Sequence, residues 1–279
     1  MKLAVSSFAW PPECTPAVRS GLTHLPEVKG VELVLPMTFP DPARTTRSEA
    51  VEVRDAWNEA GLSVVSVQSL VFGNPDLRLF GDEDVSMRLL DHLEYMGRLA
   101  DWLGARVMVF GSPANRLRGD LTMDEALYKA AGFFKQLGQR ISPLDVTVCI
   151  EPNPSIYAGC DFINTMAQAA QLVEMVDHPS VRVQCDTGAI IHEQRSGATP
   201  SAGALENALQ RSAHLHISNP GLLPLQDSDG EQARCAEQVL PHLHLSWASI
   251  EMRTPPGADP LAAIERAVGA VRGWYPIEP

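Results

Sequence analysis

Short apolar or β-branched runs recur along this 279-residue chain, and segments with helical periodicity separate them. Such alternation predicts repeated strand–helix units, because parallel strands need a crossover connection that is usually a helix. Eight units in about 250 residues are typical of a closed (β/α)₈ TIM barrel, an α/β fold, and we predict one such domain over residues 1–279. The predicted strands are residues 3–8, 31–35, 63–67, 106–110, 146–150, 181–185, 214–217 and 245–250.

Helix-boundary signals support the segments between these strands. Thr122 and Glu125 form a capping box, in which each side chain bonds the other residue's backbone N–H. Asp259 before Pro260 is a typical N-cap followed by a first-turn proline. The clearest periodic segments are residues 48–60, 85–103 and 162–176, and the first two end just before Gly61 and Gly104.

Charge and cysteine usage exclude several classes of partner. The net charge is −12 and no run of Lys or Arg stands out, so we expect neither nucleic acid nor an anionic membrane as a partner. No stretch approaches the ~18 apolar residues of a membrane span. The five cysteines contain no CxxC pair, which argues against a disulfide framework or a structural zinc site. We therefore expect a cytoplasmic protein.

Four of the last strands end in a side chain that can bind a metal. Glu151, Asp186, His216 and Glu251 follow one another at separations of 35, 30 and 35 residues. One strand–helix unit of such a barrel takes roughly 31 residues, so each of these residues lies one strand further around the ring. The spacing predicts that all four point to one spot at the carboxyl ends of the strands.

Three carboxylates in one small cavity favour a bound cation, since like charges otherwise force protonation. An oxygen-rich set with one imidazole suits Mn²⁺, Mg²⁺ or Co²⁺, and Zn²⁺ is also compatible. A single strand-end carboxylate more often caps a helix, so the prediction depends on all four together. His214 shares the face of His216, and the residues alone do not choose between the two histidines.

Several motifs carry a family resemblance that covers nearly the whole chain. "GVELVLP", "IEPNP", "CDTGAI", "HLHISNPGLLPL" and "SIEMR" resemble the sugar phosphate isomerase/epimerase superfamily. These xylose isomerase-like barrels include tagatose epimerase and hydroxypyruvate isomerase. The resemblance implies a divalent-metal-dependent isomerase or epimerase of a small sugar or polyol, phosphorylated or not. It implies proton transfer through a metal-stabilised enediolate, and a homodimer by analogy.

The resemblance also implies roles for single residues. It makes His216 the ligand in preference to His214, and it makes Glu151 and Glu251 both ligands and proton carriers. Two positions depart from the sugar epimerases, in which a histidine and an arginine hold the carbonyl end of the substrate. Here these positions are Ala189 and Leu222.

Those departures keep other activities open. A metal-dependent lyase or dehydratase would use the same proton abstraction and then expel a leaving group. A phosphodiester hydrolase is less favoured, because it needs more histidines and a basic surface. A binding module without activity is a further alternative, although it would have no need of all four ligands.

Six more residues are candidates for substrate contact. Phe8 and Trp10 are either the apolar wall of the cleft or barrel packing. Glu32 is either an acid beneath the pocket or the buried partner of an arginine. The candidates that could replace the missing substrate contacts are Arg116, His192 and Arg253.

Overall fold

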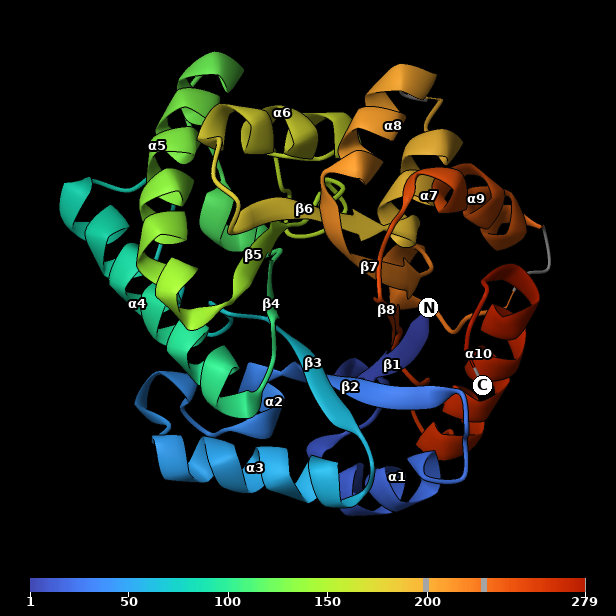
Figure 1. Cartoon of the computed structure of the whole chain (residues 1–279). Coiled ribbons are helices and arrows are strands. Elements are labelled where there is room, and N and C mark those ends of the chain that lie inside the picture. Colours follow the sequence, from blue (N-terminus) through green and yellow to red (C-terminus); the bar gives the residue numbers. More distant parts are fainter. Residues whose placement is uncertain (198–200, 227–229, 279) are drawn as a thin grey trace.

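The computed structural model describes residues 1–197, 201–226 and 230–278. Eight parallel strands form a closed barrel in chain order, with the helices outside it (Figure 1). The predicted TIM barrel and all eight predicted strands are therefore confirmed. The strands are β1 (Lys2–Ser6), β2 (Val28–Val34), β3 (Ser63–Gln68), β4 (Val107–Phe110), β5 (Thr147–Ile150), β6 (Val181–Asp186), β7 (Ser212–Ser218) and β8 (Trp247–Glu251).

The helices follow the strands and return the chain to the opposite end of the barrel. They are α1 (Thr15–Leu22), α2 (Leu35–Thr38), α3 (Arg47–Glu59), α4 (Glu83–Leu103), α5 (Met123–Ile141), α6 (Met166–Val176), α7 (Thr187–Arg195), α8 (Ala202–Gln210), α9 (Glu231–Val239) and α10 (Pro260–Trp274). No helix in these described ranges has the length and apolar character that crossing a membrane requires.

Local signals explain most helix boundaries. The capping box of Thr122 and Glu125 is formed at the start of α5, and Asp259 caps α10. The predicted helix over residues 162–176 was too long, because α6 begins only at Met166. Thr165 caps this helix, and Ile163 has a φ of 56°, a left-handed conformation that interrupts a right-handed helix.

The interior of the barrel is polar near the carboxyl ends of the strands. Ser6 lies beside Glu32 in the register, Glu32 lies beside Ser66, and His216 lies beside Ser249. All five residues are buried. The large apolar core lies between the strands and the helices, so the helices stabilise the barrel from outside while polar side chains meet within it.

Candidate metal centre

Three of the four predicted ligands meet at the carboxyl end of the barrel. Nδ1 of His216 lies 3.0 Å from Oε1 of Glu151 and 3.3 Å from Oε2 of Glu251. One potential ligand atom from each of these residues lies within 4.8 Å of the other two. The spacing of the strand ends therefore predicted this convergence of β5, β7 and β8 correctly.

Asp186 lies at the edge of this group. Its Oδ1 accepts hydrogen bonds from the backbone N–H of Gly188, at 2.8 Å, and from the hydroxyl of Ser218. Its Oδ2 accepts no hydrogen bond from the described residues. Asp186 lines the same cavity as Glu151 and Glu251, so its free oxygen belongs to the same site. We call Glu151, Asp186, His216 and Glu251 the upper cluster.

Like charges raise the proton affinity of the upper cluster. Burial raises the pKa of Asp186 to about 7, and the carboxylates of Glu151 and Glu251 add to this shift. Burial also raises the pKa of Glu251, although the neighbouring His216 opposes the shift. Without a cation, this site therefore retains protons near neutral pH.

The residues of the upper cluster fit a divalent ion. They supply three carboxylates and one imidazole nitrogen, a donor set for oxygen-preferring divalent metals. Space is also kept for them, because a Cβ atom on Gly111 would collide with Oε2 of Glu151. A cation at this spot would offset the repulsion that otherwise holds protons on Asp186 and Glu251.

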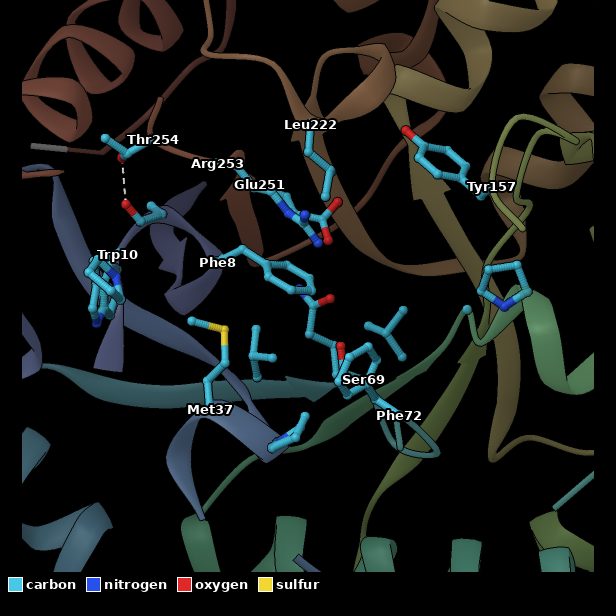
Figure 2. Close-up of a pocket in the computed structure, with 18 of the residues that line it drawn as sticks. Phe8, Trp10, Met37, Ser69, Phe72, Tyr157, Leu222, Glu251, Arg253 and Thr254 are labelled. Atoms are coloured by element: carbon cyan, nitrogen blue, oxygen red, sulfur yellow. Dashed lines mark hydrogen bonds between the residues drawn. The ribbon is translucent and has the colours of Figure 1, made fainter. Parts of the chain in front are cut away.

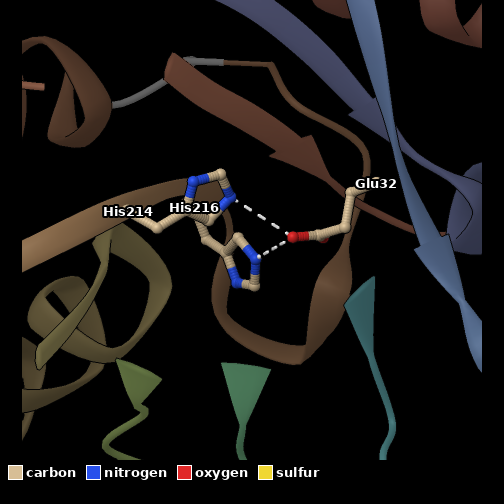
Figure 3. A group of neighbouring side chains, drawn as sticks. All are labelled: Glu32, His214 and His216. Atoms are coloured by element: carbon tan, nitrogen blue, oxygen red, sulfur yellow. Dashed lines mark hydrogen bonds and ion pairs between the residues drawn. The ribbon is translucent and has the colours of Figure 1, made fainter. Parts of the chain in front are cut away.

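A second group of ionisable side chains lies beneath the first one, in the barrel interior. Oε2 of Glu32 lies 3.0 Å from Nε2 of His216 and 3.3 Å from Nε2 of His214 (Figure 3). Ser66 donates a hydrogen bond of 2.6 Å to the same oxygen, and Gln68 donates one of 2.5 Å to Oε1. We call Glu32, His214, Ser66 and Gln68 the lower network.

The lower network orients His216. Nε2 of His216 faces Glu32, and Nδ1 faces the carboxylates of the upper cluster. A proton on Nε2 that is donated to Glu32 leaves the lone pair of Nδ1 free to bind a metal. Burial alone would lower the pKa of His216, but Glu251 and Glu32 raise it well above its ordinary value. Burial would raise the pKa of Glu32, but both histidines hold it well below the ordinary value.

A cavity of ≈ 860 Å³ opens above the upper cluster. Loops from different strands are tied together around it. Arg253 donates its backbone N–H to the carbonyl of Leu222 at 2.8 Å, and the Tyr157 hydroxyl accepts the N–H of Gly221 at 2.7 Å. The cavity therefore lies on the side of the barrel where enzymes of this fold keep their active sites.

The remaining predicted residues divide into two groups. Phe8, Trp10 and Arg253 line the cavity, as the predicted substrate contacts require. Arg116 and His192 do not line it, so the structure contradicts these two predictions. The guanidinium of Arg116 is buried and donates to the carbonyls of Glu151, at 2.7 Å, and Ile163, at 3.3 Å, where it fixes the loop after β5.

His192 lies on α7, away from the cavity lining. Glu32 is an acid beneath the pocket and does not contact an arginine, so of its two interpretations the first is correct. Glu32 is completely buried and is not among the lining residues of the cavity, so its contact with a substrate stays a prediction. Ala189 is buried outside the cavity lining, whereas Leu222 lines the cavity.

Sequence reasoning missed several polar residues of the site. Asn153 donates a hydrogen bond of 3.0 Å to Oε2 of Glu151, two residues before it in the chain. Ser66 and Gln68 are polar at alternate positions of a buried strand, a pattern that indicates inward-facing side chains. Ser218 follows His216 at the same spacing, so the same signal could have found it.

Comparison with known proteins agrees with this geometry. The model of the family described as xylose isomerase-like TIM barrel matches residues 27–258. No curated protein sequence matches the chain significantly.

Three solved structures show the same fold at low sequence identity. The 3-keto-D-glucoside 4-epimerase of E. coli has a TM-score of 0.73 at 17% identity, over 98% of this chain and 99% of that one. D-psicose 3-epimerase of Clostridium cellulolyticum H10, with D-tagatose, has a TM-score of 0.73 at 13% identity over 98% of each chain. The IOLI protein with a binding zinc atom has a TM-score of 0.71 at 14% identity, over 99% of this chain and 100% of that one. This chain belongs to the xylose isomerase-like TIM barrel family.

Proposed function

We propose that this protein is a divalent-metal-dependent isomerase or epimerase that acts on a small sugar or polyol. One observation carries the proposal: Glu151 and Glu251 both reach Nδ1 of His216 and both line one cavity. Paired carboxylates at a cavity are the groups that proton transfer at carbon requires. Two epimerases and a zinc-binding protein on the same fold add support.

The two glutamates would carry the proton. They project from β5 and β8, which are not neighbours in the barrel, so a substrate between them presents one face to each. One carboxylate takes a proton from the carbon beside a carbonyl group, and the electron pair moves onto the carbonyl oxygen. In epimerisation, the other glutamate, initially protonated, delivers its proton to the opposite face of that carbon as the electron pair returns and the carbonyl group re-forms. In isomerisation it protonates the former carbonyl carbon, and the hydroxyl group of the first carbon passes its proton to the former carbonyl oxygen as the new carbonyl forms. Asn153 keeps the Glu151 carboxylate in one orientation through its hydrogen bond.

The upper cluster would hold the metal through Glu151, Asp186, Nδ1 of His216 and Glu251. When bound there, a divalent ion supplies Lewis-acid stabilisation of negative charge on substrate oxygens. The apolar side chains of the cavity exclude water, which strengthens every electrostatic interaction between these residues and the substrate.

Elimination is the second candidate activity. Leu222 lines the cavity at the position where the sugar epimerases carry a substrate-binding arginine, and this substitution is compatible with a dehydratase. Proton removal would be the same, and a leaving group on the next carbon would then depart. Phosphodiester hydrolysis has less support, because Arg253 is the only cation among the described residues that line the cavity, against three carboxylates.

Deuterium incorporation separates these reactions. The protein, with added Mn²⁺, is incubated in D₂O with a panel of ketoses, keto-sugars, inososes and keto-glycosides with methyl or phenyl substituents, and products are measured by mass spectrometry. An isomerase or epimerase gives carbon-bound deuterium in a product that keeps all its oxygens. A dehydratase gives a product that has lost one water. If no member of the panel shows exchange or conversion, the proposed proton transfer is contradicted.

A further inference from the structure

The cavity is larger than a sugar alone requires. At the ~30 Å³ that one water molecule takes in the liquid, a ring sugar of about a dozen non-hydrogen atoms fills at most about 360 Å³. The cavity measures ≈ 860 Å³. More than half of it therefore lies outside the space of a monosaccharide held at the upper cluster.

Large apolar side chains line this outer part. Phe8, Trp10, Met37, Phe72 and Leu222 come from the segments that follow four different strands, and they surround the cavity (Figure 2). In this view the Phe8 ring lies between Glu251 and Phe72. The acidic end and the apolar end are thus two parts of one continuous cavity.

The apolar surface continues onto the rim. Phe72 is 74% exposed, although it lines the cavity. A large apolar side chain that is exposed while it lines a cavity is available for contact with a ligand.

Few charged side chains line the cavity. In the described part of the lining, the charged residues are three carboxylates of the upper cluster and Arg253. The Arg253 guanidinium lies 5.3 Å from the centroid of the Phe8 ring, in a cation–π arrangement. The lining offers no cluster of cations for a phosphate group, so the outer part suits an uncharged ligand.

Backbone strain is also concentrated at this opening. Seven described residues other than glycine have a positive φ, and four of them line the cavity. Leu222 is one, with a φ of 57°, and its carbonyl accepts the N–H of Arg253. Such conformations cost about 1–3 kcal/mol and persist where the surrounding structure imposes them, often at ligand sites. The four residues are Ser69, Ser112, Ala158 and Leu222.

From these observations we infer that the outer cavity binds an uncharged apolar group, such as an aromatic ring, that is attached to the sugar. The substrate would then be a keto-sugar or polyol with a hydrophobic substituent, and not a free or phosphorylated monosaccharide. This inference rests on the proposed function for the sugar end. Phe72 and Leu222 are its specificity-determining residues, because both line the apolar part and neither belongs to the upper cluster.

Calorimetric titration with paired glycosides tests the inference. Methyl and phenyl β-D-glucosides, galactosides and xylosides are titrated into the Mn²⁺-treated protein. They contain no carbonyl group and cannot react, so they report binding alone. Burial of only ~60 Å² of the phenyl ring corresponds to about tenfold tighter binding. We expect at least that phenyl preference for one or more sugars; its absence in all pairs, whether through equal binding or none, overturns the inference.

Two variants locate the subsite. Phe72→Ala and Leu222→Ala should each reduce the phenyl preference, which is the ratio of phenyl to methyl glycoside affinity, at least about threefold, since hot-spot contacts to the ring are lost. Tyr128→Ala is the matched control, because Tyr128 is 77% exposed and lies on α5 outside the cavity lining. A phenyl preference that survives both variants places the ring elsewhere and overturns the inference. Deuterium exchange tests the proposed function independently of either result.

Discussion

Two clusters of ionisable side chains share His216, and they differ in what surrounds them. The upper cluster faces an open cavity, and its carboxylates repel one another. The lower network is sealed in the barrel, where Glu32 is satisfied by Ser66, Gln68 and both histidines. In both places three side chains bring potential ligand atoms within 4.8 Å of one another: Glu151, His216 and Glu251 above, and Glu32, His214 and His216 below.

The difference explains why similar side chains have different roles in the two groups. A carboxylate whose lone pairs are filled by hydrogen bonds is already stabilised, and a metal would have to displace those partners. Carboxylates that crowd without enough donors are stabilised only by protons or a cation. We therefore assign metal binding to the upper cluster and orientation of His216 to the lower network.

The largest expected effect is on turnover. Glu151→Gln and Glu251→Gln should each reduce deuterium exchange by at least about 10²–10⁴, because an amide cannot carry the proton. Mass spectrometry at saturating Mn²⁺ checks this loss apart from weaker metal binding. Glu193→Gln is the matched control, since Glu193 is a buried glutamate outside the cavity. If a Gln variant keeps near-wild-type exchange, the glutamate that it replaces is a metal ligand and does not carry the proton.

The next effect concerns the link between the two clusters. Glu32→Gln should weaken Mn²⁺ binding by roughly 10–100-fold, as is typical when the hydrogen-bond partner of a ligating histidine is changed. Fluorescence-monitored or calorimetric titration measures the affinity, and the nitrogen chemical shifts of His216 report its tautomer. Unchanged affinity together with an unchanged tautomer would show that the lower network does not orient His216.

Metal binding should also depend on pH. Asp186 has a pKa of about 7 without metal, so its proton must leave before it can bind an ion. Affinity should therefore fall as the pH drops below about 7, by up to about tenfold per pH unit for each proton displaced. For folding, the sign is opposite: the raised pKa favours the metal-free folded state at low pH, and this contribution is lost as the pH rises toward 7. A metal affinity that stays constant between pH 8 and pH 6 would show that metal binding displaces no proton from Asp186.

The smallest effect is expected at His214. His214→Gln should lower Mn²⁺ affinity by no more than about tenfold. Its Nε2 faces Glu32 and Ser249, and Glu32 keeps its other partners without it. Titration of this variant beside His216→Ala gives the comparison. An equal loss in both would mean that His214 is itself a ligand.

The sequence predicted the barrel and the position of the upper cluster because both follow from spacing. One strand–helix unit has a nearly constant length, so Glu151, His216 and Glu251 are all placed near the carboxyl ends of their strands. Asp186 was predicted in the same way, but Ser218 and Gly188 hold its carboxylate at the edge of the group. That displacement depends on side-chain hydrogen bonds, which spacing does not record.

Spacing could not predict the contacts of the lower network or the burial of Arg116. The sequence left two interpretations of Glu32 open, because its partners lie 182 and 184 residues away and only the closed barrel brings them together. Arg116 follows a strand end, as a substrate-binding residue would. Its burial against two backbone carbonyls depends on how the loop after β5 folds.

Calorimetric titration of Mn²⁺ into the metal-free protein tests the central distinction most directly. Asp186→Asn changes only the upper cluster, and His214→Gln changes only the lower network, so the two variants separate the groups that share His216. We predict that one Mn²⁺ ion binds per wild-type chain and one per chain of His214→Gln, and that Asp186→Asn shows no measurable binding. Retained binding in Asp186→Asn together with lost binding in His214→Gln would contradict it and place the metal in the lower network.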